Sequence, residues 1–80
     1  MSPAEAQEVK SLLLDNDPAY RELADRHHQL DDKLHQFTDR HYLTDSEHIE
    51  EVTLKKLKLA LKDQMERMAR EYAQAHARAS

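Results

Sequence analysis

The sequence contains no cysteine and no glycine, and each absence excludes particular kinds of site. Without cysteine there are no disulfides, no thiolate metal ligands and no cysteine nucleophile. Without glycine the chain cannot build a glycine-rich phosphate loop, a dinucleotide-binding fingerprint or a nucleophile elbow. Tight turns between paired strands also depend heavily on glycine, so its absence favours a helical protein.

Long apolar runs are lacking as well. The longest purely aliphatic run is Leu12–Leu14, whereas a transmembrane helix needs roughly 20 consecutive apolar residues. The run is also too short for the apolar region of a signal peptide. We therefore expect no membrane span and a cytoplasmic location.

What the sequence does contain is typical of α-helices. Alanine, leucine, glutamate, lysine, glutamine and arginine are abundant in the 80 residues, and only two prolines interrupt them. A chain of this length forms one small domain, which we place at residues 1–80. Because such a domain buries little apolar surface, it needs further stabilisation from well-packed helices or from oligomerisation.

Charges are unevenly distributed along the chain, which carries a net charge of −4. Residues 1–43 hold five Lys or Arg against nine Asp or Glu, whereas residues 55–70 hold six against two. The net charge argues against a dedicated polyanion-binding protein. The acidic and basic regions can instead attract each other if they fold together.

Capping signals predict where the helices begin. Ser2 is suited to an N-cap and Glu5 completes a capping box with it, and Thr44 with Glu47 repeats the pattern. Between these two boxes, an aspartate followed by Pro18 predicts the start of a further helix. One alternative stays open, in which Pro18 only kinks a continuous helix by removing a backbone hydrogen bond. The three expected helices span residues 3–14, 18–40 and 44–77.

Apolar residues recur in steps of three and four along the second and third expected helices, the spacing of a helix-packing stripe. Two such stripes predict an all-α fold in which an antiparallel, coiled-coil-like helical hairpin follows a short N-terminal helix. The third helix is the longer one, so its last turns need cover from the first helix or from a partner chain. The second-helix stripe is Tyr20, Leu23, His27, Leu30, Leu34, Phe37 and His41, and the third-helix stripe is Leu54, Leu57, Leu61, Met65, Met68, Tyr72 and Ala75.

A second apolar line on the third helix indicates a contact beyond the hairpin. Ile49, Val52 and Leu59 lie on the side opposite the packing stripe. One neighbour cannot cover both sides of a helix, so the first helix or another chain is expected there. We interpret these three residues as a candidate interaction surface, and we expect the protein to self-associate as a dimer or a higher oligomer.

Lys55, Lys58 and Lys62 form a basic stripe on the third helix. As phosphate ligands they would make this a small nucleic-acid-binding or regulatory protein, which is the alternative function. However, Glu51 and Glu66 bracket the stripe, and no aromatic residue is interleaved with it to stack on bases. We therefore favour a solvated outer side and treat nucleic acid as the less favoured partner.

The chain has six histidines, and two groups of them need an interpretation. His28, Asp32 and His35 project from one side of the second helix, where they could share a divalent metal. Because no His-x-x-x-His pair and no Glu-x-x-His motif occurs, we expect no metal site and no cofactor. His27 lies on the apolar stripe and needs a polar partner, which Asp31 or a polar group of the third helix could supply. We interpret His27 as a structural histidine, and a pH-sensing role stays a hypothesis.

Groups that would support catalysis are not apparent. The serines lie at helix ends or in the short first helix, and the carboxylates face outward. No water-excluding pocket is expected between so few helices. We therefore expect a non-enzymatic protein without catalytic residues.

Two segments carry a family resemblance. The segment "HHQLDDKL" supplies His27, Leu30, Asp31 and Leu34, and "LKKLKLALKDQM" supplies Lys55, Lys56, Lys58, Leu59, Leu61, Lys62 and Asp63. Together with "NDP" at Asn16 to Pro18, these segments resemble the YdcH-like family of small bacterial helical proteins of unknown function. The resemblance covers about residues 12–68.

The resemblance implies a helical hairpin and a bacterial cytoplasmic origin, and it implies no activity. Among the motif residues, His27, Asp31, Lys62 and Asp63 have no known role. Residues and resemblance together therefore predict a protein–protein interaction or self-association module with an unidentified protein partner.

Overall fold

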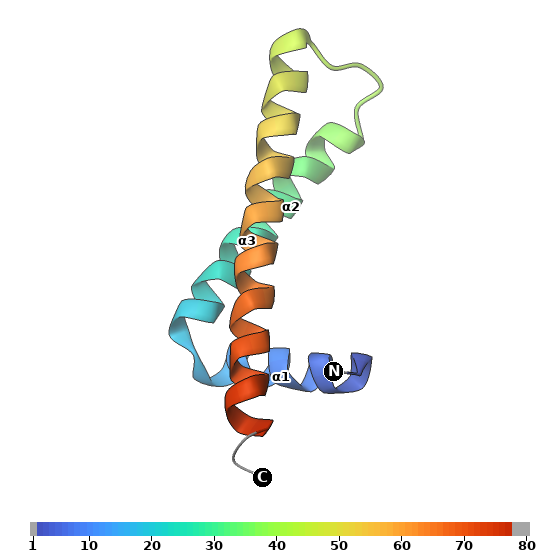
Figure 1. Cartoon of the computed structure of the whole chain (residues 1–80). Helices are drawn as coiled ribbons and strands as arrows, with labels where there is room; N and C mark the ends of the chain where they lie inside the picture. Colours follow the sequence, from blue (N-terminus) through green and yellow to red (C-terminus); the bar gives the residue numbers. More distant parts are fainter. Residues whose placement is uncertain (1, 78–80) are drawn as a thin grey trace.

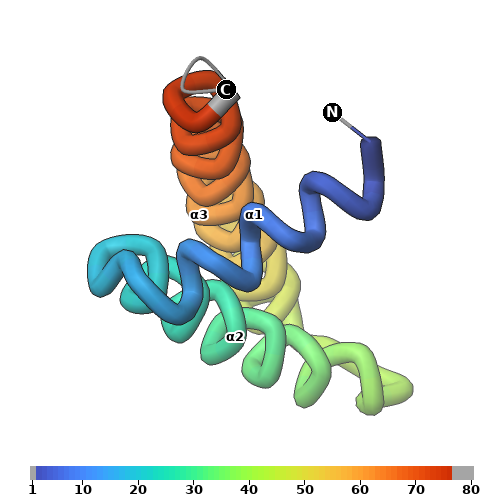
Figure 2. The backbone as a smooth tube through the Cα atoms, turned by 90° about the horizontal axis from the view of Figure 1, so that it is seen from below, coloured from blue at the N-terminus to red at the C-terminus, as the bar shows by residue number. Residues whose placement is uncertain are grey.

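Residues 2–77 are described by a computed structural model in which three α-helices follow one another without a strand between them (Figure 1). The helices are α1 (Pro3–Asn16), α2 (Pro18–Thr38) and α3 (Asp45–Ala77). The expected all-α class is confirmed. Helices α2 and α3 run in opposite directions and share the largest helix–helix contact, and α1 lies across the end where α2 begins and α3 ends (Figures 1 and 2).

Ser2 and Thr44 both act as N-caps, as predicted, but within residues 2–77 the full capping box forms at Thr44 and not at Ser2. The Ser2 hydroxyl accepts a hydrogen bond from the Glu5 backbone N–H at 3.2 Å. Thr44 and Glu47 form a reciprocal capping box, with N–H to side-chain distances of 3.2 and 3.1 Å. Each cap supplies an acceptor for a backbone donor that the first helical turn leaves without a partner.

Pro18 separates two helices and does not merely kink one. Asp17 between them has extended backbone angles, φ −114° and ψ 106°. Its carboxylate accepts hydrogen bonds from the backbone N–H groups of Ala19 and Tyr20 at 2.9 and 3.2 Å. The extended residue and its N-cap role redirect the chain, so that α1 leaves the axis of α2 (Figure 2).

Three helix ends differ from the expected positions for local reasons. Helix α1 continues to Asn16, whose side-chain amide donates to the Leu12 carbonyl at 2.9 Å. Helix α2 ends at Thr38 and not at residue 40, because Arg40 already bonds the Phe37 carbonyl in a tighter turn. Helix α3 begins at Asp45, one residue after the capping Thr44. The expected last stripe position, His41, therefore lies outside α2 and is exposed.

The core is small and is centred where all three helices meet. Leu13, Tyr20 and Ala69 are buried there, and Tyr20 is the most enclosed, with 2% of its surface exposed. Helix α1 thereby covers Met68 and Tyr72 of α3, so the part of α3 that extends beyond α2 is covered in part. Val9, Met65, Met68 and Tyr72 pack around these three residues, and we call the whole set the Tyr20 cluster.

The packing side of α3 differs from the predicted stripe. Leu54 is buried as expected, but Leu57 is 50% exposed and Lys58 is half-buried next to it. Ala69, a buried member of the Tyr20 cluster, follows Lys58 by eleven residues, about three helical turns, so both lie on one side. Because Ala69 packs inward, α3 turns its Lys58 side towards the neighbouring helices and its Leu57 side towards solvent. Ala75, the last predicted stripe residue, is also exposed.

None of the helices within residues 2–77 is both long enough and apolar enough to cross a lipid bilayer.

Candidate functional site

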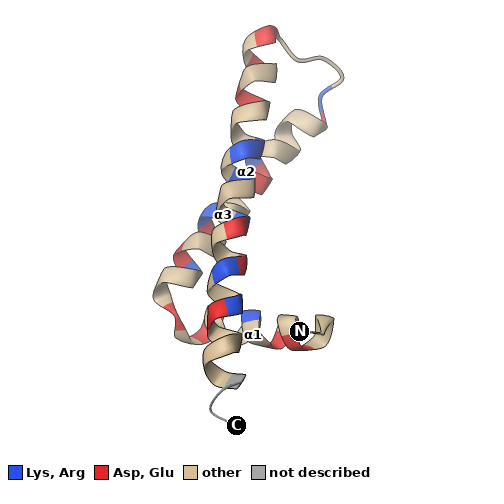
Figure 3. Ribbon diagram, in the orientation of Figure 1, with Lys and Arg blue, Asp and Glu red and all other residues tan. Residues whose placement is uncertain are grey.

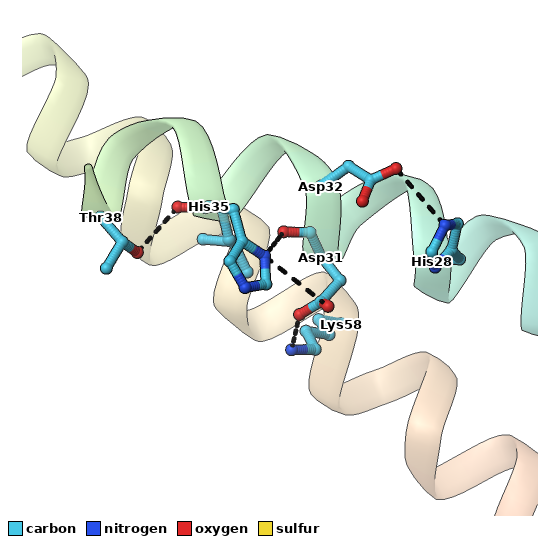
Figure 4. Close-up of polar contacts among 7 residues, drawn as sticks. His28, Asp31, Asp32, His35, Thr38 and Lys58 are labelled. Atoms are coloured by element: carbon cyan, nitrogen blue, oxygen red, sulfur yellow. Dashed lines mark hydrogen bonds and ion pairs between the residues drawn. The ribbon is translucent and has the colours of Figure 1, made fainter. Parts of the chain in front are cut away.

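The central polar contact of the molecule joins Lys58 of α3 to Asp31 of α2 (Figure 4). The Lys58 ammonium donates a hydrogen bond to the Asp31 carboxylate, and within residues 2–77 no other ion pair links these two helices. Both side chains are partly enclosed, with 32% and 35% of their surface exposed. The prediction that Lys58 belongs to a solvated outer side is therefore wrong, because the rotation of α3 brings it onto the packing side.

Two histidines of α2 surround the same carboxylate. His35 lies with Nδ1 2.7 Å from the Asp31 carbonyl oxygen and 3.7 Å from its carboxylate (Figure 4). The hydrogen bond from Lys58 is the main reason that the pKa of Asp31 lies below its ordinary value, and the charges of Lys58, His35 and His27 act in the same direction. The Asp31 side chain thus bonds Lys58, and no hydrogen bond joins it to His27 within residues 2–77, although Asp31 was one of the two partners considered for that histidine.

A hollow of about 370 Å³ opens beside this ion pair, between α2 and α3. We call it the central hollow. Its lining brings together residues that the sequence had placed in separate groups: His27 and Asp31 of the first motif segment, the basic stripe, and Leu59 of the apolar line. The lining includes His27, Asp31, Lys55, Lys58, Leu59 and Lys62.

A second hollow of about 300 Å³ shares Lys58 and Lys62 with the central one and extends it towards α1. Lys10 of α1 and Glu66 of α3 line this extension. The contribution of Lys10 was not predicted. Its position follows only from the docking of α1, and no periodic pattern in the sequence indicates it.

The three residues of the predicted interaction surface are all exposed. The exposed fractions are 69% for Ile49, 50% for Val52 and 58% for Leu59. Their positions differ. Leu59 lines the central hollow, whereas Ile49 and Val52 lie nearer the start of α3.

The remaining lysines of the basic stripe differ in their surroundings. Lys55 lies 3.8 Å from the Glu51 carboxylate, one turn earlier on α3, as the sequence predicted. Lys62 takes part in no ion pair within residues 2–77, although Glu66 lies one turn later. Figure 3 shows Lys and Arg residues from the central turns of α3 onward, with acidic residues in its first turns. The family-motif residue Asp63 is exposed next to Lys62.

The candidate metal ligands of α2 point to different partners. His28 Nε2 lies 3.5 Å from the Asp32 carboxylate on the exposed surface, whereas His35 turns towards Asp31 (Figure 4). Across residues 2–77 no three His, Asp or Glu side chains are placed to share a metal ion. These side chains therefore act in the structure as partners in polar contacts along one helix.

Comparison with known proteins supports the family resemblance. The family model described as "Protein of unknown function (DUF465)" matches residues 21–69, which is more than half of the chain. This segment contains both motif regions and the lining that α2 and α3 give to the central hollow. No curated protein and no solved structure matches the chain. YdcH itself is a member of the matched family. This chain therefore belongs to the DUF465 family of small domains of unknown function.

Proposed function

We propose that this protein is a non-enzymatic helical hairpin that works through protein–protein contact, including self-association. Its contact surface consists of Ile49, Val52 and Leu59, which we call the α3 outer surface. One observation carries the proposal: these three large apolar side chains are at least half exposed on a helix whose other side already packs against α1 and α2.

The size of the core adds support. Within residues 2–77 only five apolar residues are buried, and their positions are spread along the helices. Burial of apolar surface stabilises by about 25 cal/mol per Å². Covering three aliphatic side chains in a partner contact would therefore add substantially to a domain with a thin core.

The basic stripe gives less support to nucleic-acid binding. Lys58 is already bonded to Asp31, and Lys55 lies close to Glu51. Lys62 is thus the stripe member most available for a phosphate. A mobility-shift titration at about 50 mM salt tests this alternative, because phosphate contacts are strongest at low salt.

The location of the protein is part of the same proposal. The family resemblance implies a bacterial cytoplasmic protein, and a chain without cysteine suits a reducing compartment. Fractionation of cells that express the chain at its native level would check the location.

Static light scattering tests the proposed function. We expect the purified protein to have the mass of a dimer or higher oligomer at about 50 μM, and to dissociate on dilution. The variant Leu59→Lys should shift the equilibrium towards the monomer. Leu57→Lys is a matched control, because Leu57 is similarly exposed but lies on another side of α3. A parent protein that is monomeric at this concentration, or a Leu59→Lys variant of unchanged mass, contradicts the proposal.

A further inference from the structure

Two exposed stripes on different helices have opposite charge and the same spacing. On α1, Glu8, Leu12 and Asp15 follow one another in steps of four and three residues. On α3, Lys55, Leu59 and Lys62 follow the same steps. Because such steps keep residues on one side of a helix, each set forms a short line with a leucine between two like charges. We call them the acid–Leu–acid stripe and the Lys–Leu–Lys stripe.

All six side chains of the two stripes belong to exposed residues. The exposed fraction is 39% for Leu12 and 58% for Leu59. No ion pair engages Glu8, Asp15 or Lys62 within residues 2–77, and Lys55 has one contact, at 3.8 Å with Glu51, whose side chain is 20% exposed. Lys62 is thus the stripe lysine most available to another carboxylate, and Lys55 would share its charge between Glu51 and the docking helix.

The two stripes of one chain do not meet. Helix α1 packs through Leu13 and Val9 into the Tyr20 cluster. This places Glu8 and Leu12 beside Tyr72, towards the end of α3, whereas the Lys–Leu–Lys stripe borders the central hollow. The first turns of α1 project away from the α2–α3 pair (Figures 1 and 2). The acid–Leu–acid stripe therefore does not reach the Lys–Leu–Lys stripe of its own chain, and its residues stay exposed.

We propose that α1 of a second copy of this chain docks on the Lys–Leu–Lys stripe at the rim of the central hollow. This proposal rests on the proposed self-association and names its partner element. With the two helices parallel, Glu8 lies opposite Lys55, Leu12 opposite Leu59 and Asp15 opposite Lys62. Because each copy carries both stripes, a two-fold arrangement makes the contact twice and closes the dimer. An amphipathic helix laid along a groove is an established mode of recognition.

The leucine between the two lysines favours a protein helix over a nucleic acid as the occupant. The net charge of −4 and the carboxylates of Asp31 and Glu66 oppose a polyanion and an acidic helix alike, so they do not distinguish the two. Exposed Leu59 offers an apolar contact that Leu12 fits and a phosphate does not.

Charge reversal with complementation tests the proposal on the full chain. One double variant is Lys55→Glu with Lys62→Glu, and the other is Glu8→Lys with Asp15→Lys. Because each places like charges opposite each other, we expect dimerisation to weaken about a hundredfold in either variant alone. An equimolar mixture of the two restores opposite charges at both contacts, so we expect it to regain the parent's mass and affinity. Sedimentation equilibrium measures all three samples.

Two controls keep the outcome decisive. Lys33→Glu changes an exposed lysine of α2 on the side of the hairpin where Leu57 lies, outside both stripes, and should leave the mass unchanged. Circular dichroism shows whether each variant keeps the helical content of the parent. Should a reversal variant unfold, the neutral pair Lys55→Gln with Lys62→Gln replaces it, and this pair must reduce the salt dependence of dimerisation.

The outcomes separate this inference from the proposed function. An oligomeric parent whose mass and affinity are unchanged in both reversal variants leaves self-association standing and overturns docking of α1. A mixture that stays monomeric also overturns docking of α1. A monomeric parent overturns both proposals, and a monomer that binds nucleic acid through Lys55 and Lys62 assigns the stripe to that partner.

Discussion

Lys58 and Asp31 form an ion pair at a position where the neighbouring contacts between α2 and α3 are apolar. Leu54 and Leu61 lie about one turn before and after Lys58 on the same side of α3, and both are at least partly buried. A one-turn slide of α3 along α2 would bring Lys55 or Lys62, which line the same hollow, towards Asp31 in place of Lys58. The pair therefore joins the two helices but does not by itself set their register.

The rotated packing side of α3 predicts unequal costs for two leucines. Leu54→Ala should lower the free energy of unfolding by about 2–4 kcal/mol, because it removes a buried side chain and leaves a cavity. Leu57→Ala should cost less than about 1 kcal/mol, because half of Leu57 is already in water. Urea unfolding followed by circular dichroism measures both values. Equal costs would show that Leu57 faces α2 after all.

The Asp17 N-cap should contribute more to stability than an ordinary surface aspartate does. Its carboxylate serves two backbone donors at the start of α2, and we expect Asp17→Ala to cost about 1 kcal/mol of stability. Asp25→Ala is the matched control, since Asp25 is an exposed aspartate within α2. Thermal melting of the two variants beside the parent gives the comparison. Equal melting temperatures for the two variants would contradict the capping role.

Acid should weaken the fold partly through Asp31. The pKa of Asp31 is lowered in the folded chain, so its stabilising contribution is complete above the ordinary carboxyl pKa and is lost as the pH falls through the folded value. We expect the melting temperature to fall below about pH 4, where ordinary aspartates gain their protons. Asp31→Asn should make this fall shallower.

Asp32→Asn is the control for the acid experiment. Asp32 is the next residue on α2, and its only ion-pair contact in the described chain is with exposed His28 at 3.5 Å. This change should leave the acid dependence close to that of the parent. The role given to Lys58 would be refuted by an Asp31→Asn variant that loses stability with acid as steeply as the parent does.

Tyr20 should make the fold sensitive to alkali. Burial raises the pKa of the Tyr20 hydroxyl, so the folded chain holds this proton more tightly than the unfolded chain. Its stabilising contribution is complete below the ordinary tyrosine pKa of about 10 and is lost as the pH rises above it. Tyr20→Phe keeps the ring in the core and removes the ionisation. We expect this variant to lose less stability than the parent between about pH 9 and 11, measured by urea titration.

Local signals determined the helical part of the structure. The caps at Ser2, Asp17 and Thr44 and the break before Pro18 can be read from the sequence because each involves neighbours a few residues apart. The stripe of α2 was also predictable as far as Phe37, since its spacing is regular. The exposure of Ile49, Val52 and Leu59 follows from the same periodicity, because these residues lie away from any α3 stripe that can face α2.

The tertiary structure decided which of two adjacent stripes of α3 faces inward. Leu57 and Lys58 are neighbours in sequence, and apolarity alone favours Leu57. With α1 packed on Tyr20 and Ala69, α3 is turned so that its Lys58 side packs inward. Lys58 then bonds Asp31, which lies 27 residues earlier in the chain. Periodicity defines the sides of a single helix. The side that packs depends on the summed contacts of all three helices, which no local pattern contains.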